Sequence, residues 1–273
     1  MEKRLNQVLG GTRLDAQGEK LSKKFIEKFC SSCEGRKIPL HQHHDMSRQT
    51  AGYIENLRVE KDPKNDGEWS IVGDVYSEIG AIDELIGGFS ISGTETIHRP
   101  DEFNLMLYIP YPTYNDDKFV ENLLATDEIH LSKWIKKGVE PASCALFVAV
   151  FAIVITPVWD HVYKRKIAPL VDRFMDEEWP KIRAKNLGLE HAQLIDYEGY
   201  EIEIRLIGVS GKERECYSPE VIQEAVKVAV DEVESDFSES NPITRLVLFY
   251  DSGSCNYKLH RTEYYTGNSV HHA

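Results

Sequence analysis

The chain of 273 residues has few cysteines, no surplus of positive charge and no apolar leader at its amino terminus. Its five cysteines form no dense, even framework, which argues against a disulfide-stabilised fold and favours a reducing compartment. A formal net charge of −13 argues against nucleic acid as a partner, because the phosphate backbone requires a cationic surface. Residues 1–20 lack the apolar core of a secretory signal, so we expect a cytoplasmic protein.

Composition and length are those of a folded globular protein. Hydrophobic residues make up 41% of the chain and charged residues 28%, which argues against wholesale disorder. The chain is long enough for one large domain or for two of ordinary size. We expect an α+β protein in three parts: a first domain at residues 1–139, an apolar segment with a charged helical linker at 140–186, and an α+β module at 187–273.

One long uncharged stretch separates the two folded parts. No residue between Glu140 and Asp160 is charged, and the stretch reads PASCALFVAVFAIVITPVW. Its length lies between that of a membrane span and that of a buried core helix. Trp159 lies where an interfacial aromatic residue would, and a Lys-Arg-Lys cluster follows. The pattern predicts a central apolar helix, which either associates with a membrane through residues 142–159 or forms a buried or self-associating surface, as in a homo-oligomer.

The first part combines short strands with a few helices. Apolar residues at helical spacing, Phe25 and Ile26 among them, predict a helix within residues 18–35. Residues 52–61 and 68–77 alternate apolar and polar side chains and are joined by a turn that contains Asp66-Gly67. Several strands with little helical alternation predict a small β-barrel or sandwich with flanking helices.

The carboxy-terminal part reads as a helix over a small sheet. We expect a strand at residues 200–209, then a strong amphipathic helix capped by Ser218 with Pro219 at its first position. A hairpin of residues 242–251 and 256–265 follows. This part shows no nucleophile motif, phosphate-binding loop or metal-ligand spacing, so we interpret it as a binding or regulatory module.

A cluster of histidines is the first feature that carries chemistry. His41, His43 and His44 fall within four positions, a short distance after Cys30 and Cys33. Tetrahedral zinc accepts two thiolates and two imidazoles, so Cys30 and Cys33 could form a metal site with His41 and His43. The cysteines, however, fall inside a helical pattern, and a single C-x-x-C pair is a weak signal. We therefore expect inert thiols, and neither a metal nor another cofactor.

A serine strand offers a nucleophile for a catalytic histidine. In GGFSISG, Ser90 and Ser92 project from one face of a strand and Phe89 and Ile91 from the other. Serine is a poor nucleophile at neutral pH unless a neutral imidazole accepts its proton. On spacing alone, an ordinary polar strand face explains these residues better than a catalytic site does.

The order of motifs over residues 12–113 resembles the tailed-phage prohead (capsid maturation) protease family, which is related in fold to the herpesvirus assembly proteases. TRLDAQGEKLSKKFIEKF resembles the entry of that family, IPLHQHHD its histidine element, GYIENLRVE the glycine-started strand that follows, and GGFSIS its serine strand. The resemblance implies a serine endopeptidase on a small β-barrel, acting on a protein substrate. By position, Ser90 matches the nucleophile and His44 the general base.

The sequence departs from the family pattern at two places. Ser92 and then Gly93 follow Ile91, where the family has glycine directly after the isoleucine, so Ser92 is a second nucleophile candidate. The third catalytic member is open as well; the candidates are His98, Asp101, Glu102 and Asn104. Without an orienting group the imidazole loses its preferred tautomer and the rate falls steeply. The alternative is therefore an inactive, protease-like binding or sensor domain coupled to a membrane-inserting or oligomerising helix.

Overall fold

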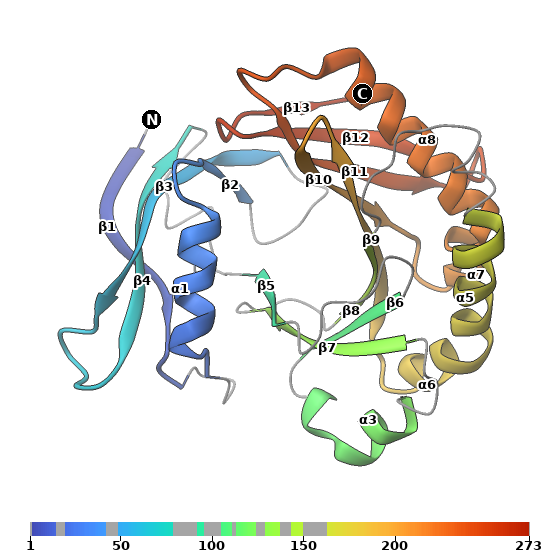
Figure 1. Ribbon diagram of the computed structural model, residues 1–273, viewed down its shortest axis with the longest axis horizontal. Coiled ribbons are helices and arrows are strands. Elements are labelled where there is room, and N and C mark those ends of the chain that lie inside the picture. Colours follow the sequence, from blue (N-terminus) through green and yellow to red (C-terminus); the bar gives the residue numbers. More distant parts are fainter. Residues whose placement is uncertain are drawn as a thin grey trace. The chain divides into compact units, whose positions relative to one another are not determined.

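The computed structural model is an α+β structure with two sheets and several helices (Figure 1). The residues it describes are 2–14, 20–41, 49–78, 92–95, 105–110, 113–123, 129–136, 143–149 and 163–272. The chain divides into two compact units. Unit 1 comprises residues 1–95, 135–140 and 263–269, and unit 2 comprises residues 96–134, 141–262 and 270–273.

Unit 1 is built on a four-stranded antiparallel sheet. Its strands lie in the order β1 (Glu2–Gly11), β4 (Trp69–Ser77), β3 (Thr50–Lys61) and β2 (Ile38–His41). The predicted turn joins β3 to β4, with Gly67 in the left-handed region at φ +82°. A barrel closes only when its first and last strands pair. Across the described residues this sheet is open, with β1 and β2 at its edges, so no closed barrel is found there.

The predicted helix of unit 1 is confirmed as α1 (Lys23–Ser32). Ser22 caps it, since its side-chain oxygen accepts a hydrogen bond from the Phe25 amide at 3.1 Å. Phe25 and Ile26 are buried and pack in one cluster with strand residues such as Leu9 and Val75. The amphipathic pattern therefore locates the core of unit 1 between α1 and one face of the sheet.

The larger sheet has nine strands in the order β13-β12-β11-β10-β9-β8-β6-β7-β5. It is mixed: β10 and β11, β8 and β9, and β6 and β7 pair in parallel, whereas β9 with β10 and β6 with β8 are antiparallel. The strand bounds are β5 (Ser92–Glu95), β6 (Leu105–Pro110), β7 (Ile129–Lys136), β8 (Ser143–Ala149), β9 (Gly188–Tyr197), β10 (Tyr200–Ile207), β11 (Ile243–Asp251), β12 (Asn256–Tyr264) and β13 (Ser269–His271).

The helices of unit 2 are η2 (Thr113–Asn115), α3 (Asp117–Leu123), η3 (Tyr163–Ile167), α5 (Ala168–Arg173), η4 (Phe174–Glu178), α6 (Trp179–Arg183), α7 (Glu213–Cys216) and α8 (Pro219–Asp236). The predicted order of strand, amphipathic helix and hairpin is confirmed as β10, α8, β11 and β12. The buried face of α8 contacts β10 and β11, where Ile204 and Leu246 have no exposed surface. The parallel pairing of β10 with β11 follows because the helix crosses over between them.

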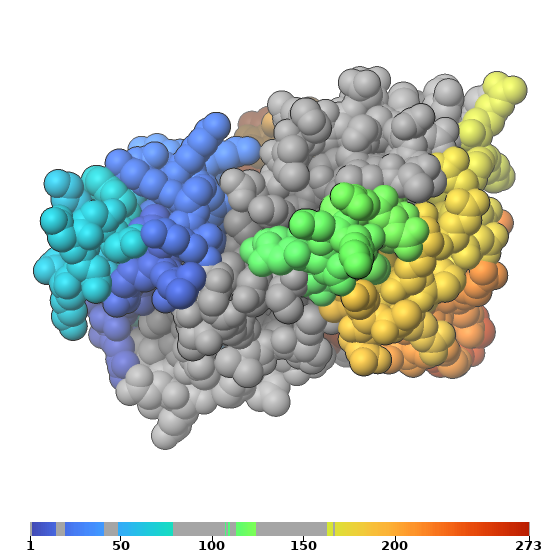
Figure 2. Space-filling view, turned by 90° about the horizontal axis from the view of Figure 1, so that it is seen from below, coloured from blue at the N-terminus to red at the C-terminus, as the bar shows by residue number. Residues whose placement is uncertain are grey.

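Two helices at the surface of unit 2 are joined by lysines. The Lys185 ammonium lies 2.7 Å from the Asp116 carboxylate, and the Lys181 ammonium donates to the Asn122 carbonyl at 3.3 Å. Figure 2 shows this arrangement on the surface: the green residues of α3 lie beside the yellow residues of α6.

The apolar segment differs from its prediction. Residues 143–149 form β8, hydrogen-bonded to β6 on one side and to β9 on the other, where a helix was expected. The periodicity of an uncharged apolar run does not distinguish a central strand from a buried helix. The prediction of a helix was therefore wrong for residues 143–149. The predicted helical linker is confirmed from Tyr163 to Arg183, and Pro180 lies in its last turn, α6. None of the described helices is both long and apolar enough to cross a bilayer.

Candidate functional site

The sequence-predicted catalytic residues fall, in chain order, between described strands. His44 belongs to the stretch that follows β2, and Ser90 precedes β5 by two positions. His43, His44 and Ser90 lie outside the described residues, as do the third-member candidates His98, Asp101, Glu102 and Asn104. Ser92 is the first residue of β5, which confirms the described part of the predicted serine strand.

The frame around the histidine stretch is an antiparallel strand pair. His41 is the last residue of β2, and it pairs with Thr50, the first residue of β3; Leu40 pairs with Gly52. The stretch that carries His44 thus starts and ends at two residues that face each other across one ladder.

Position 52 requires a glycine because β4 approaches the backbone closely there. Its φ is +147°, a value that other residues rarely adopt, and an added Cβ would lie 2.0 Å from the Tyr76 carbonyl oxygen. No side chain fits at that distance, since van der Waals contact begins more than 1 Å further out. Gly52 is also the glycine that starts the strand after the histidine element in the sequence. The close approach of the Tyr76 carbonyl explains why this position is a glycine.

The two cysteines before the histidines are poor candidates for thiolate chemistry. Burial in unit 1 raises the pKa of Cys30 to about 11. Burial also raises the pKa of Cys33, against the opposing effect of a hydrogen bond with Ser32. Metal binding and redox exchange both use the thiolate, so both thiols are held in the unreactive form at neutral pH.

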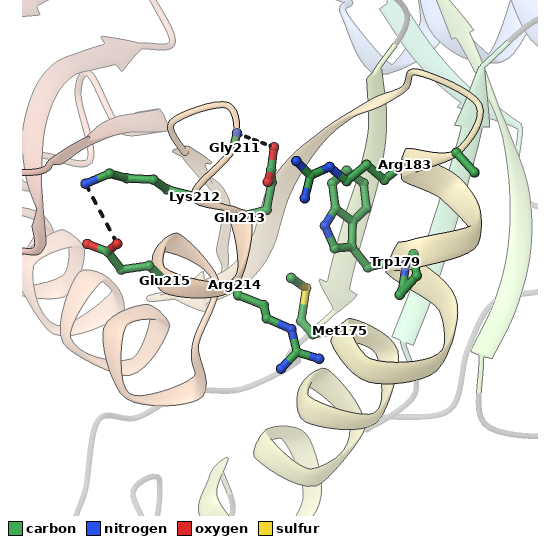
Figure 3. A pocket seen from close by; sticks show the side chains of 10 residues that line it. Met175, Trp179, Arg183, Gly211, Lys212, Glu213, Arg214 and Glu215 are labelled. Atoms are coloured by element: carbon green, nitrogen blue, oxygen red, sulfur yellow. Dashed lines mark hydrogen bonds and ion pairs between the residues drawn. The ribbon is translucent and has the colours of Figure 1, made fainter.

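A second candidate site is a surface cavity in unit 2 with a volume of about 650 Å³ (Figure 3). One wall comes from the helical segment η4–α6 and the other from the turn and helix at residues 211–215. Trp179 and Met175 supply apolar surface, and both are nearly buried. The remaining lining residues are Pro180, Arg183, Ala184, Gly211, Lys212, Glu213, Arg214 and Glu215.

Most charges of this cavity are neutralised within the fold. The Glu213 carboxylate accepts a hydrogen bond from the Gly211 amide at 2.8 Å, and Arg214 binds Asp176. Glu215 accepts a hydrogen bond from the Tyr250 hydroxyl at 2.5 Å, which together with Lys212 holds the pKa of Glu215 below its ordinary value. Arg183 is exposed and has no acidic partner among the described residues. Among the described residues, Arg183 is therefore a free cation that the cavity can offer beside an apolar wall.

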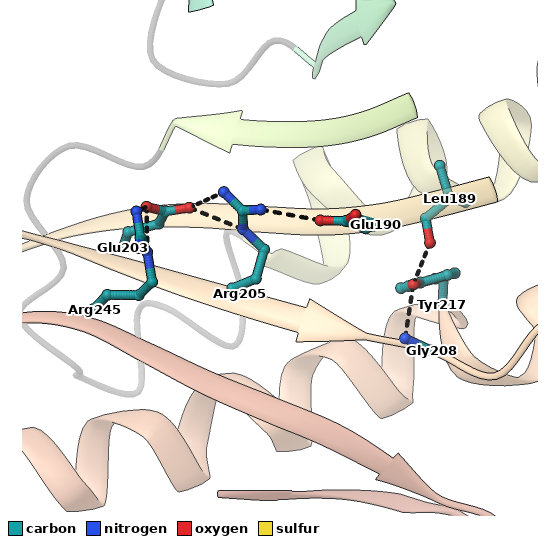
Figure 4. A network of polar contacts seen from close by, with 7 residues as sticks. All are labelled: Leu189, Glu190, Glu203, Arg205, Gly208, Tyr217 and Arg245. Atoms are coloured by element: carbon teal, nitrogen blue, oxygen red, sulfur yellow. Dashed lines mark hydrogen bonds and ion pairs between the residues drawn. The ribbon is translucent and has the colours of Figure 1, made fainter. Parts of the chain in front are cut away.

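A charged network crosses three strands of the larger sheet (Figure 4). Arg205 on β10 binds Glu190 at 3.0 Å and Glu203 at 2.5 Å, and Arg245 on β11 binds Glu203 at 2.7 Å. Burial alone would raise the pKa of Glu203, but the two arginines outweigh it and lower that pKa to about 2. Every member has an opposite charge beside it, so the arrangement is that of a structural network.

The opposite face of β9 holds two buried polar residues that are not part of this charged network. His191 and Gln193 on β9 are 0% and 1% exposed, and none of their ring or amide atoms has a hydrogen-bond partner within the described chain. Burial lowers the pKa of His191 to about 4, so its imidazole is neutral. Sequence reasoning missed both residues, since a histidine and a glutamine inside a strand give no signal that they are buried.

Comparison with known proteins gives no further constraint: no family model, no curated protein and no solved structure matches the chain. The resemblance to prohead proteases therefore rests on its sequence motifs alone.

Proposed function

We propose that the chain is a serine endopeptidase of the prohead-protease type, with Ser90 as nucleophile and His44 as general base. The observation that carries the proposal is the order of elements in unit 1. The entry motif begins directly after β1 and includes most of α1, the histidine element begins with β2, the glycine-started strand is β3, and the last residue of the serine motif begins β5. The described elements thus follow the order of the motifs, although the closed barrel that the resemblance also implies is not found among the described residues.

Gly52 supports the proposal on independent, steric grounds. A glycine at this position could be accidental, but the backbone around it admits no other residue. The strand that follows the histidine stretch in the chain, β3, approaches β4 closely at Gly52. The glycine in the motif is therefore explained by the geometry of the β3–β4 pair.

The proposed reaction is acyl transfer to the serine followed by hydrolysis. The Ser90 oxygen attacks the peptide carbonyl carbon while the His44 imidazole accepts the hydroxyl proton and passes it to the leaving amine. Backbone N–H groups close to the serine would stabilise the oxyanion. A water molecule then releases the acyl group by the same route. The substrate is a protein segment, and no metal or nucleotide is needed for this chemistry.

Labelling with a fluorophosphonate, followed by peptide mapping of the adduct, tests the proposal. We expect one adduct, on Ser90, that is absent in Ser90→Ala and forms roughly 10²–10⁴-fold more slowly in His44→Ala. Ser92→Ala and His41→Ala are the matched controls and should be labelled at the parental rate. An adduct on Ser92, or none in protein shown to be folded, would overturn the assignment.

The alternative is a protease-like binding domain without catalysis, and the cavity of unit 2 favours it. A cavity of about 650 Å³ is within the size range of ligand sites. Insertion of the apolar run as a helix does not form part of either proposal, because residues 143–149 are paired within the sheet on both sides. A folded protein that the fluorophosphonate does not label would favour the binding function.

A further inference from the structure

The cavity of unit 2 lies where two neighbouring strands of the larger sheet begin and end. Its first wall, η4–α6, precedes β9 in the chain, and its second wall, at residues 211–215, follows the end of β10. The two strands run antiparallel, with Glu190 near the start of β9 opposite Ile207 at the end of β10. Both walls therefore leave the sheet on the same side, at the carboxyl end of β10, where open α/β sheets commonly bind small ligands.

The first wall of the cavity offers apolar surface. Trp179 and Met175 line it with the small part of their surface that stays exposed, 4% and 5%. Pro180 and Ala184, on the same segment, are exposed. The two large side chains are held by the packing around them, so this wall is a preformed surface against which an apolar group can pack.

Two charged groups of the cavity lack an oppositely charged partner among the described residues. One is the exposed guanidinium of Arg183. The other is the carboxylate of Glu213, a residue that is only 8% exposed. The hydrogen bond that Glu213 accepts from the Gly211 amide, at 2.8 Å, comes from a neutral group. A carboxylate buried to this extent is destabilising unless a charge of opposite sign comes beside it.

The remaining charges of the cavity lining are paired. Arg214 binds Asp176, and the Lys212 ammonium lies 3.8 Å from the Glu215 carboxylate. Glu215 is also held by the Tyr250 hydroxyl, which donates to it at 2.5 Å. A ligand that enters the cavity therefore meets one cation and one anion that the described part of the fold has not already paired.

The two unpaired groups come from opposite walls of the cavity. Arg183 belongs to α6 and Glu213 to α7, and Figure 3 shows both side chains reaching into the space between the walls. A ligand with an anionic group at Arg183 and a cationic group at Glu213 would satisfy both. An apolar group on the same ligand would then lie against the first wall, beside Trp179.

We propose that this cavity binds a free α-amino acid with a large apolar side chain. The Arg183 guanidinium binds the carboxylate of the ligand, which suits its planar set of donors, and the Glu213 carboxylate binds the ammonium group. The apolar side chain of the ligand packs against Trp179. All of these residues belong to unit 2, so the inference goes beyond the proposed protease chemistry and does not rest on it.

Isothermal titration calorimetry of the full chain with phenylalanine is the first measurement. We expect saturable binding at one site, and binding weaker by about tenfold or more for 3-phenylpropionate, which lacks the ammonium group, and for 2-phenylethylamine, which lacks the carboxylate. The amino acid alanine, which keeps both charges but lacks the ring, should also bind about tenfold more weakly. Either truncated compound binding as tightly as phenylalanine would overturn the proposal, as would the absence of binding by phenylalanine, leucine, methionine and tryptophan.

Substitutions at the two unpaired groups separate their roles. Arg183→Gln should weaken phenylalanine binding by about tenfold or more without weakening that of 2-phenylethylamine, and Glu213→Gln should do the same without weakening that of 3-phenylpropionate. Glutamine at position 213 keeps an acceptor for the Gly211 amide, and Arg183 is exposed, so both variants should fold.

The matched controls are Arg214→Gln and Glu215→Gln, which remove paired charges of the same cavity. They should bind phenylalanine within about threefold of the parent. Equal losses of affinity in the variants and the controls would overturn the assignment of Arg183 and Glu213, and so would parental affinity in both variants. If Glu213→Gln does not fold, Arg183→Gln and its control decide alone.

Discussion

Acid should destabilise this protein through one buried histidine, His191 on β9. Its ring has no exposed surface, lies 6.5 Å from the Tyr217 ring, and has no hydrogen-bond partner within the described chain for either nitrogen. Protonation in the folded state would place a charge among groups that cannot solvate it. The perturbation to make is therefore His191→Leu, which keeps the volume similar and removes both nitrogens.

The magnitude follows from the pKa of His191. Burial lowers it from an ordinary value of 6.5 to about 4. A lowered pKa means that the unfolded chain binds the proton more tightly, so the stability is fully present above pH 6.5 and is lost as the pH falls through about 4. The difference between the two values corresponds to about 3 kcal/mol in the free energy of unfolding, of which about 2 kcal/mol is lost by pH 5.

Urea unfolding at pH 7.5 and pH 5, followed by circular dichroism, measures this loss. We expect His191→Leu to be more stable than the parent by about 1–3 kcal/mol at pH 7.5, because it removes unpaired polar atoms, and the gap to widen by about 2 kcal/mol at pH 5. Gln193→Leu is the control: it also removes buried unpaired atoms but does not titrate, so its gap should not change with pH. A constant gap for His191→Leu would refute the reasoning.

Three further outcomes follow from the described residues. Gly52→Ala should destabilise unit 1 by at least about 2 kcal/mol in urea unfolding, since its Cβ would meet the Tyr76 carbonyl at 2.0 Å; a loss near 1 kcal/mol would mean that β3 shifts away easily. Glu203→Gln should cost about 1–3 kcal/mol at pH 7, measured in the same way, because two partly buried arginines lose their counter-charge. In the parent, the pKa of Glu203 of about 2 means that this contribution is present above pH 4.5 and is lost as the pH falls through about 2. Thiol titration with an aromatic disulfide should modify exposed Cys255 quickly and buried Cys30 only on unfolding; equal rates would contradict the burial of α1.

Local signals in the sequence were sufficient for several elements. The helix α1 was predictable because apolar residues, Phe25 and Ile26 among them, recur at helical spacing. The helix α8 was predictable from Pro219 at its first position, and the β3–β4 hairpin from its turn at Asp66-Gly67. Each of these depends on interactions within a few residues, so the information lies in the segment itself.

Other features depend on partners far away in the chain. The run at residues 143–149 is a strand because β6 and β9 flank it, and no pattern within the run distinguishes that from a helix. The burial of His191 and the pairing of Arg205 with Glu190 are set by which strands lie side by side. Gly267 looks like an ordinary turn residue in the sequence. The steric need for glycine at this position comes from its contact with Lys37, more than two hundred residues earlier in the chain. Only folding brings these two residues together.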